Sequence, residues 1–256
     1  MTMNSVLYTI ENNIAKIALN KPEKNNAFDE QMIKELTIVL KKAADDTDVK
    51  IIILHGNGKH FSAGADLNWM RKMADASLEE NKQDALKLAE LLHTLYYCPK
   101  PTIAQIQGAN YGGGVGLIAA CDIAIATDNA TFCFSEVRLG LIPAVISPYV
   151  IQAISARIAK MLFMCGTTFD VTEAKCINLI HHITSTENLA ALTQEIALNL
   201  SLLPQDAVLA CKELTHIVAK KPIDLKLMDL TANLIAAKRQ SIEAKILMKK
   251  FLTTRA

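Results

Sequence analysis

The amino-acid sequence predicts an α/β protein, with a mostly parallel sheet and crossover helices over residues 1–140 and helices in the C-terminal third. Two observations predict this class. Short apolar runs rich in β-branched residues alternate with longer segments of helical periodicity over the first 140 residues. From about residue 143 onward the pattern is helical almost throughout, so no further sheet is expected there. The sequence contains no linker, internal repeat or low-complexity tract, which predicts one domain with a helical tail.

The N-terminal part of the predicted sheet begins with a β-hairpin. Residues 6–10 and 14–19 alternate apolar with polar side chains around a polar turn at 11–13. After a polar loop at 20–26, apolar residues recur at helical spacing from Phe28 to Leu40. The run at 50–54 (KIIIL) is too short for a helix and β-branched, so it predicts a strand that is buried on both faces.

The remaining elements follow the same periodicities. A long helix fits residues 78–97 and ends before two prolines, a strand fits 102–107, a helix fits 117–121, and short strands fit 123–126 and 131–134. Further helices are predicted at 148–165, 172–178, 187–202, 205–219, 223–239 and 241–252.

Composition and charge exclude several classes of protein. The 256 residues are 51% hydrophobic and 21% charged, which is typical of a globular chain and not of a disordered one. Lys and Arg number 27 against 26 Asp and Glu, so the basic excess that phosphate neutralisation needs is missing, and aromatic residues are sparse at 5%. We therefore expect no nucleic-acid partner.

The six cysteines and the N-terminus indicate the compartment. The cysteines form no C-x-x-C pair, and several lie in apolar stretches, which favours reduced core cysteines over disulfides. The first residues lack a basic segment followed by an apolar one, and no stretch approaches the ~18 apolar residues of a membrane span. We expect a cytoplasmic protein without a membrane partner.

Glycine is confined to the middle of the chain. All ten glycines lie between residues 56 and 166, so backbone freedom is concentrated there. Residues 60–67 (HFSAGADL) follow the strand at 50–54 and have small residues at four of the eight positions, which would let a ligand lie against the backbone. This segment is the first candidate site.

A second candidate is residues 107–116 (QGANYGGGVG), where a strand runs into a helix. Unpaired N–H groups at a helix N-terminus favour an anion or a developing negative oxygen. The alternatives are a phosphate or dinucleotide loop, and close helix–strand packing. A Rossmann fingerprint would follow the first strand of its unit, and a P-loop would contain Gly-Lys-Ser/Thr, which this sequence lacks. Close packing stays open.

Glu136 is the third candidate, because it ends an apolar strand and precedes another apolar stretch. A desolvated carboxyl group has a raised pKa and suits proton transfer. The alternative is an ion pair with Arg138, two residues on.

Together these segments resemble the crotonase (enoyl-CoA hydratase/isomerase) superfamily over nearly the whole chain. The matching motifs, in order, are residues 19–22 (LNKP), 26–28 (NAF), 61–67 (FSAGADL), 103–108 (IAQIQG), 112–114 (GGG), 121–123 (CDI), 135–136 (SE) and 139–143 (LGLIP). The resemblance implies a spiral of ββα units over 1–195, with a C-terminal helical trimerisation region over 196–256. It also implies a homotrimer or a dimer of trimers.

The resemblance further implies an acyl-CoA thioester substrate, with coenzyme A as part of the substrate and no separate cofactor. The thioester oxygen would be held by the backbone N–H groups of Ala65 and Gly113, where negative charge develops in an enolate. The implied substrate-binding residues are Lys24, Ala27, Ala63, Asp66, Leu67, Ser135 and Ala144, with a solvated loop lysine as the alternative for Lys24. Tyr111 lies close in sequence to a donor segment and is a further candidate for the acyl pocket, with core packing as the alternative. Lys249, Lys250 and Phe251 match a region that approaches CoA phosphates in some relatives, although a solvated helix end is the alternative.

Two positions depart from the family pattern. Hydratases of this family typically carry two glutamates, one of them two residues after the triple glycine; here that position is Gly116. Glu136 occupies the second position and is the expected single acid/base residue. The other departure is residues 144–149 (AVISPY), where many relatives have a glycine-rich turn. This combination resembles the methylglutaconyl-CoA hydratase branch of the family. That resemblance implies a role in leucine degradation.

We therefore expect an enoyl-CoA hydratase that uses Glu136, Ala65 and Gly113. The alternatives are a Δ3-Δ2 enoyl-CoA isomerase, for which one glutamate suffices, and a non-catalytic acyl-CoA-binding protein. The six histidines show no metal-binding spacing, so no metal site is expected.

Overall fold

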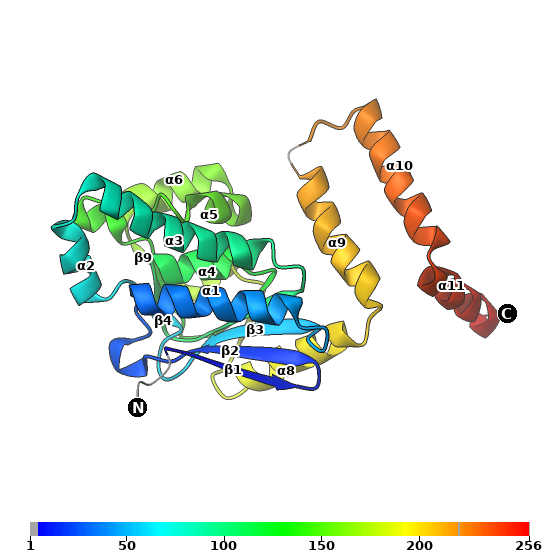
Figure 1. Ribbon diagram of the computed structural model, residues 1–256, viewed down its shortest axis with the longest axis horizontal. Helices are drawn as coiled ribbons and strands as arrows, with labels where there is room; N and C mark the ends of the chain where they lie inside the picture. The colour runs from blue at the N-terminus through cyan, green and yellow to red at the C-terminus, as the bar shows by residue number, and fades with distance from the viewer. Residues whose placement is uncertain (1–4, 220, 256) are drawn as a thin grey trace. The chain divides into compact units, whose positions relative to one another are not determined.

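A computed structural model describes residues 5–219 and 221–255 of the chain (Figure 1). Its contacts divide the chain into two compact units, one that ends at Ser201 and one that begins at Leu202. The larger unit contains both sheets, and the smaller unit contains helices. The division into residues 1–195 and 196–256 stays a prediction.

The larger unit is built on a six-stranded and a four-stranded sheet. The six-stranded sheet has the order β1 (Val6–Glu11), β2 (Ile14–Leu19), β3 (Ile51–Gly56), β5 (Thr102–Ile106), β7 (Ile123–Thr127) and β10 (His182–Thr184). The four-stranded sheet has the order β4 (Ser62–Ala63), β6 (Ala109–Tyr111), β8 (Thr131–Cys133) and β9 (Thr168–Asp170). Among the strand pairs of the described residues, only β1–β2 and β8–β9 are antiparallel.

Eight α-helices and two short 3-10 helices complete the described part of the larger unit. They are η1 (Pro22–Lys24), α1 (Glu30–Asp45), α2 (Leu67–Ala74), α3 (Leu78–Tyr96), α4 (Gly113–Ala120), η2 (Glu136–Leu139), α5 (Ser147–Ile154), α6 (Ala156–Cys165), α7 (Val171–Cys176) and α8 (Leu189–Ser201). The smaller unit contains α9 (Gln205–Val218), α10 (Leu225–Gln240) and α11 (Ile242–Arg255).

The six-stranded sheet is covered on both faces, which explains its continuous apolar strands. Alternate residues of β3 point to opposite faces: Ile51 and Ile53 pack in one cluster with Leu189 and Ala197 of α8. Ile52 and Leu54 join the larger cluster on the other face, together with residues of α1, α3 and α4. In Figure 1, α1 and α3 lie side by side on that face, and α8 lies on the opposite one.

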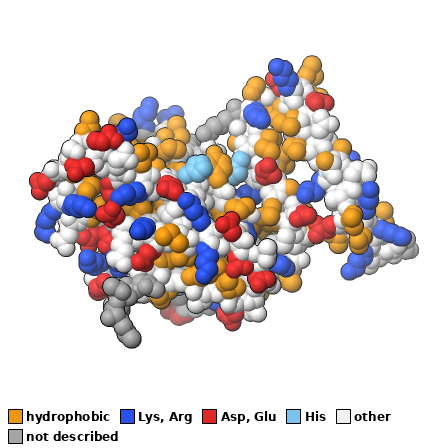
Figure 2. All heavy atoms as spheres, in the orientation of Figure 1, with side chains coloured by type: hydrophobic (Ala, Val, Ile, Leu, Met, Phe, Trp, Pro, Cys, Tyr) orange, Lys and Arg blue, Asp and Glu red, His pale blue; other side chains and the backbone are white. Residues whose placement is uncertain are grey.

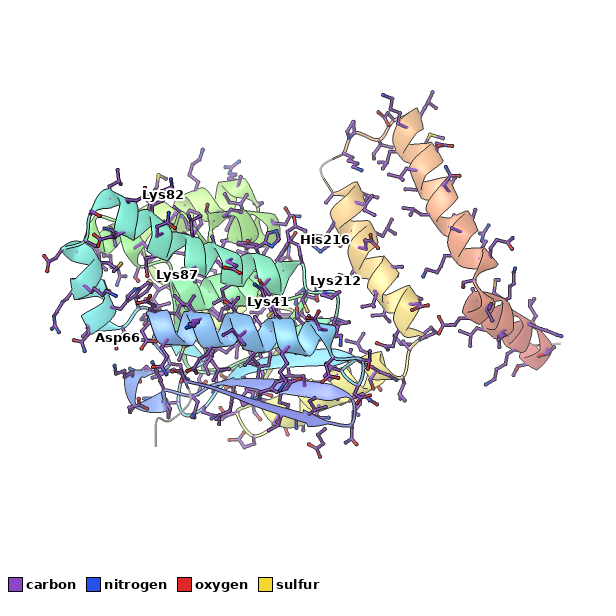
Figure 3. All side chains as sticks on the ribbon, in the orientation of Figure 1. Lys41, Asp66, Lys82, Lys87, Lys212 and His216 are labelled. Carbon is purple, nitrogen blue, oxygen red and sulfur yellow. The ribbon has the colours of Figure 1, made fainter. Side chains whose placement is uncertain are left out.

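Helix caps and ion pairs fix the helices of the larger unit. Asp29 begins α1 by accepting a hydrogen bond from the Met32 N–H, and Ser77 and Glu80 form a capping box at the start of α3. Lys41 of α1 pairs with Glu90 of α3 at 2.6 Å (Figure 3). On the face shown in Figure 2, basic and acidic side chains of the larger unit are interspersed, in keeping with the near-zero net charge.

The predicted hairpin, the strand at β3 and the long helix at α3 are confirmed. The expectation of an almost entirely helical C-terminal third missed two short strands, β9 and β10, which extend the two sheets of the N-terminal part. The single helix predicted over 148–165 is divided into α5 and α6 at Ser155, whose φ of +75° leaves the helical region.

Other expectations also need correction. Helix α4 begins at Gly113 and not at Leu117, and α2 was not predicted. Among the cysteines, Cys165, Cys176 and Cys211 are exposed and are not core residues. None of the helices within residues 5–219 and 221–255 has the length and apolar character that a membrane crossing requires.

Candidate active site

Three segments come together at one edge of the four-stranded sheet. Strands β4, β6 and β8 are parallel neighbours, so their carboxyl ends lie at the same edge. The segment after β4 carries Gly64 and Ala65, the segment after β6 begins α4 at Gly113, and the segment after β8 carries Glu136. The topology therefore gathers the three candidate segments, although up to 72 positions separate their residues in the sequence.

Close approaches among these segments define the site. The Gly112 N–H donates to the Cys133 carbonyl at 3.0 Å, which ties the start of α4 to the end of β8. A Cβ atom on Gly112 would lie 3.1 Å from Glu136 Oε1, and one on Gly64 would lie 3.8 Å from Tyr111 Cβ. Both glycines have positive φ, at +51° and +98°, a conformation that favours residues without a side chain.

The N–H groups of Ala65 and Gly113 are available for a ligand. No acceptor for either one is found within residues 5–219 and 221–255. Gly113 is the first residue of α4, where N–H groups have no partner inside the helix and carry partial positive charge. Both residues are half-buried, which strengthens a hydrogen bond to an oxygen placed between them.

Glu136 is the first residue of η2 and is half-buried. Its Oε2 atom is buried and has no hydrogen-bond partner in the described structure. Burial raises the pKa of this carboxyl group above its ordinary value, and a hydrogen bond from its own N–H opposes the rise only in part. The alternative of an ion pair with Arg138 is wrong: no such pair exists among the described residues, and Arg138 is exposed.

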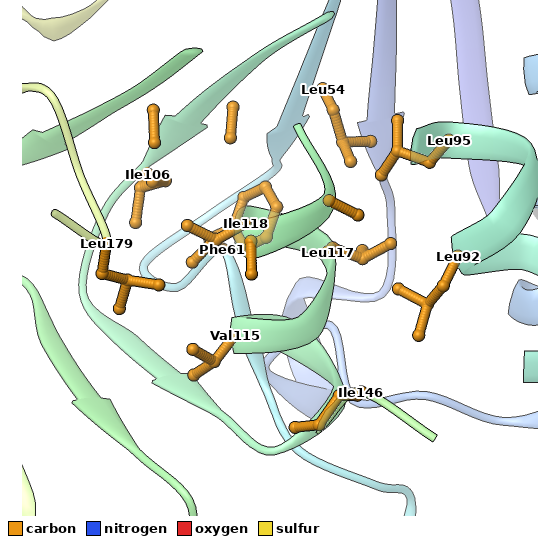
Figure 4. Packing of buried hydrophobic residues seen from close by; sticks show 14 of the residues in the cluster. Leu54, Phe61, Leu92, Leu95, Ile106, Val115, Leu117, Ile118, Ile146 and Leu179 are labelled. Atoms are coloured by element: carbon orange, nitrogen blue, oxygen red, sulfur yellow. The ribbon is translucent and has the colours of Figure 1, made fainter. Parts of the chain in front are cut away.

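The glycines of the second segment have two different uses. A Cβ atom on Gly114 would lie 2.4 Å from the Ser62 carbonyl oxygen, and one on Gly116 would lie 2.4 Å from Ile146 Cγ2. These two residues therefore serve close packing, which was the open alternative, whereas Gly112 and Gly113 border the site. Helix α4 lies in the core, with Val115, Leu117 and Ile118 among buried side chains (Figure 4).

Lys24 and Asp66 form an ion pair beside the Ala65 segment. Lys24 Nζ lies 2.8 Å from Asp66 Oδ2. Asp66 begins α2, where its Oδ1 accepts from the Asn68 and Trp69 N–H groups (Figure 3). The hydrogen bond with Lys24 lowers the pKa of Asp66 and raises the pKa of Lys24. The ion pair therefore holds the Lys24 ammonium group next to Asp66, and the Lys24 side chain is 44% exposed.

The other predicted substrate-binding residues vary in position. Ala63 and Tyr111 end the paired strands β4 and β6, Ser135 directly precedes Glu136, and Leu67 is 68% exposed in the first turn of α2. Ala27 is buried, with 7% exposure, so its side chain offers little surface to a ligand. Ala144 is exposed and follows the 136–143 segment. Lys249, Lys250 and Phe251 lie in α11 of the smaller unit.

His60 holds the strand that leads to the second candidate segment. Its Nδ1 atom accepts a hydrogen bond from the Ala109 N–H at 2.8 Å, which holds the start of β6. Burial lowers the pKa of His60 and so favours the neutral ring that can accept this bond. These contacts give His60 a structural role beside the site. No group of three or more His, Cys, Asp or Glu side chains in the described ranges is arranged to hold a metal ion.

Sequence reasoning missed two contributions. Ile146, which is 2% exposed, fills the space beside Gly116. Phe28, also 2% exposed, contacts the segments of both N–H groups. The only signal for Phe28 was its place in the 26–28 motif, and the only signal for Ile146 was the missing glycine-rich turn.

Comparison with known proteins gives the family. The model for the family "Enoyl-CoA hydratase/isomerase" matches residues 9–255. A Legionella pneumophila protein assigned as an enoyl CoA hydratase/isomerase (crotonase) is similar in structure, with a TM-score of 0.95 and 49% identity over 99% of this chain and 98% of that one. An enoyl-CoA hydratase from Shewanella pealeana has a TM-score of 0.94 and 40% identity over 99% and 95% of the two chains.

A relative with an isomerase name also matches. The trans-2-decenoyl-[acyl-carrier-protein] isomerase of Streptococcus mutans is 28% identical over 84% of this chain and 82% of its own length. The family model, which covers almost the whole chain, and the two structures agree with the fold described above. The chain belongs to the enoyl-CoA hydratase/isomerase family and has the crotonase fold.

Proposed function

We propose that the protein is an enoyl-CoA hydratase, which adds water across the α,β double bond of an acyl-CoA thioester. One observation carries the proposal: Glu136, whose Oε2 atom is buried without a partner among the described residues, has its Oε1 atom close to Gly112, the residue directly before the Gly113 N–H group. A base and an oxyanion donor side by side suit a reaction that forms an enolate. The relatives named as hydratases support the same reaction class.

In this mechanism the Ala65 and Gly113 N–H groups bind the thioester carbonyl oxygen. Each such donor can stabilise a developing oxyanion by roughly 3–4 kcal/mol in the transition state. Glu136 takes a proton from water as the water oxygen bonds to the β-carbon, and the electron pair of the double bond moves into the enolate. Glu136 then returns that proton to the α-carbon. One carboxylate therefore completes the addition without a net change of charge on the enzyme.

The coenzyme A part of the substrate is proposed to lie along the 63–67 segment. Ala63, Asp66 and Leu67 contribute backbone and small or exposed side chains there, and Lys24 contributes a partly exposed cation near Asp66. Tyr111, Ser135 and Ala144 are proposed to contact the acyl group. The proposed substrate carries a branched acyl chain such as 3-methylglutaconyl, because the sequence pattern at 135–149 resembles the methylglutaconyl-CoA hydratase branch. We further propose that the protein is cytoplasmic and forms a homotrimer or a dimer of trimers.

A Δ3-Δ2 enoyl-CoA isomerase is the second candidate, and Gly116 favours it. A second carboxylate at position 116 is absent and Ile146 fills its space, so proton transfer must use Glu136 alone. In an isomerase the same carboxylate would move a proton from the α- to the γ-carbon. A binding protein without catalysis is the third candidate.

A substrate panel separates these candidates. The chain is incubated with crotonyl-CoA, 3-methylglutaconyl-CoA and a 3-enoyl-CoA, while the conjugated thioester absorbance is followed. Loss of absorbance with the first two supports hydration, and a gain with the third alone supports isomerisation. Binding without turnover of any of them supports the third candidate. Glu136→Gln should abolish turnover, whereas Glu173→Gln, at an exposed glutamate of α7, should retain it.

A further inference from the structure

Phe28 connects the two backbone segments that supply the oxyanion donors. The residue lies between η1 and α1, outside both sheets, and is buried. Its N–H donates to the Gly64 carbonyl at 2.8 Å, and its carbonyl accepts from the Asp66 N–H at 2.7 Å. These two hydrogen bonds flank Ala65, which forms an isolated parallel β-bridge with Phe28.

The bridge determines the direction of the Ala65 N–H. Successive peptide groups of an extended segment point to opposite sides. Because Gly64 and Asp66 are bonded to Phe28, the N–H of the residue between them points away from Phe28. This agrees with the finding that the Ala65 N–H has no acceptor in the described parts of the chain. The backbone of Phe28 therefore sets the orientation of the first donor.

The ring of Phe28 packs against the second donor residue. A Cβ atom on Gly113 would lie 2.6 Å from both Cδ2 and Cε2 of the ring, which is closer than packed atoms come. The ring thus lies directly on the α-carbon of Gly113. Side-chain packing holds the start of α4 on one side, and backbone hydrogen bonds hold the 64–66 segment on the other.

The short segment that contains Phe28 is anchored by Asn26, two residues earlier, which is fully buried. The Asn26 side-chain amide donates to the Asn57 and His60 carbonyls at 2.9 and 2.8 Å. The Asn26 carbonyl accepts from Ser62 Oγ at 2.9 Å. The 26–28 segment is therefore anchored to the chain that leads into β4, and a change in the ring cannot be absorbed by a free movement of this segment.

We propose that Phe28 is a positioning residue that sets the distance between the Ala65 and Gly113 N–H groups, and that it thereby tunes oxyanion stabilisation. The inference rests on the proposed function of these two donors. The thickness of the ring fixes how closely α4 approaches the 64–66 segment. A displacement of about 1 Å in such a constellation can lower the rate by roughly 100-fold.

The test compares Phe28→Leu with Leu40→Ala, a substitution of a fully buried residue of α1 in the same core cluster. Both variants lose core packing, but only Phe28→Leu changes the contact with Gly113. For Phe28→Leu, kcat should fall by about tenfold to 100-fold while KM changes by less than about threefold. For Leu40→Ala, both constants should stay near the wild-type values at a comparable loss of thermal stability.

A spectroscopic readout isolates the donors. Acetoacetyl-CoA is a β-keto thioester whose enolate absorbs in the near ultraviolet, so its absorbance reports how strongly the site stabilises an enolate. At fixed pH, the enolate fraction on Phe28→Leu should be several-fold lower than on the wild type and on Leu40→Ala. Wild-type kcat and a wild-type enolate fraction in folded Phe28→Leu, or equal losses in both variants, would overturn the proposal.

A further measurement separates this inference from the proposed function. If the wild type itself binds acetoacetyl-CoA without forming the enolate, the proposed function fails. The position of the donors is then read from the backbone amide resonances of Ala65 and Gly113. Larger shifts in Phe28→Leu than in Leu40→Ala support the positioning role, and equal shifts contradict it.

Discussion

Burial raises the pKa of Glu136. This carboxyl group carries the chemistry proposed for the site, and its burial also destabilises the folded state. Its Oε2 atom is buried without a partner among the described residues. A buried polar group without a hydrogen bond destabilises the folded state. Such a group persists at a functional site because a substrate or water supplies the missing partner.

Glu136→Gln should therefore raise stability while it removes activity. The raised pKa means that the folded chain binds more protons than the unfolded chain above the ordinary pKa of a glutamate, about 4.3. The stability contribution of Glu136 is then present below that pH and is lost as pH rises through the raised pKa. At pH 7 the variant should melt on the order of 2 °C higher or more, with kcat lower by about 100-fold or more.

Thermal melts of both proteins at pH 7 and pH 4 check this expectation. The gain should be much smaller at pH 4, where the carboxyl group is mostly neutral in both states. A variant that is less stable than the wild type at pH 7 would show that ionised Glu136 has a stabilising partner in solution.

The pH dependence of activity follows from the same group. Glu136 must be ionised to accept a proton from water, so kcat/KM should fall as pH decreases through its raised pKa. We expect the acid limb of the profile above the usual glutamate range of about 4.3. Initial rates with a saturating and a limiting substrate concentration from pH 4 to pH 9 measure this limb. A limb at or below the usual range would contradict a desolvated base.

At the scale of elements, α4 combines a site-forming N-terminus with a buried body. Its N-terminal N–H groups face the site, while Val115, Gly116 and Leu117 are fully enclosed by the core. Gly116 allows α4 and the 144–147 segment to approach closely, because Ile146 occupies the space that a side chain would need. The absence of a carboxylate at position 116 and the presence of the bulky Ile146 therefore belong to one packing arrangement.

Gly116→Glu should therefore fail to create a second catalytic carboxylate. A side chain there meets Ile146 Cγ2 at 2.4 Å and would bring a charge into the core, which should destabilise the protein by roughly 3 kcal/mol or more. The double variant Gly116→Glu/Ile146→Gly should recover part of that loss. Urea unfolding of the three proteins measures the difference. Equal stabilities of the single and the double variant would show that Ile146 does not fill this space.

The elements also show how far the sequence could predict the structure. The β1–β2 hairpin and α3 were predictable because alternation and helical periodicity extend over six or more residues. Strands β4, β6, β9 and β10 have two or three residues each, too few for a periodic pattern. The division at Ser155 depends on its φ of +75°, which no neighbouring glycine indicated.

The candidate site was predictable to a different extent. Small residues and glycines identified the 60–67 and 107–116 segments, because a backbone site requires the absence of side chains. The roles of Phe28 and Ile146 depend on contacts with residues 85 and 30 positions away in the sequence. Local patterns contain no information on such contacts, so these roles emerge only from the folded chain.

At the scale of the whole molecule, the two units differ in how they bury apolar residues. The larger unit has an extensive core, whereas none of the described side chains of α9 and α10 is buried. Ile223, Leu225 and Ile242 are each at least 80% exposed. Apolar surface of this kind is typical of a helical region that packs in an assembly.

We therefore expect the purified chain to form a trimer or a dimer of trimers. Light scattering coupled to size exclusion should give three or six times the chain mass of 28.0 kDa. Leu225→Glu/Ile242→Glu should lower this mass, because charges would oppose the burial of these side chains. A wild-type protein that remains at the mass of one chain over the micromolar range would contradict the expectation.

In the proposed reaction one carboxylate, Glu136, adds water to an enoyl thioester whose oxygen is held by the Ala65 and Gly113 N–H groups. The most direct test is turnover of crotonyl-CoA in water enriched with oxygen-18, followed by mass spectrometry of the product. We expect a 3-hydroxyacyl-CoA that carries one solvent oxygen at the β-carbon, formed by the wild type and lost in Glu136→Gln. No solvent oxygen in the product, or equal incorporation by Glu136→Gln, would contradict it.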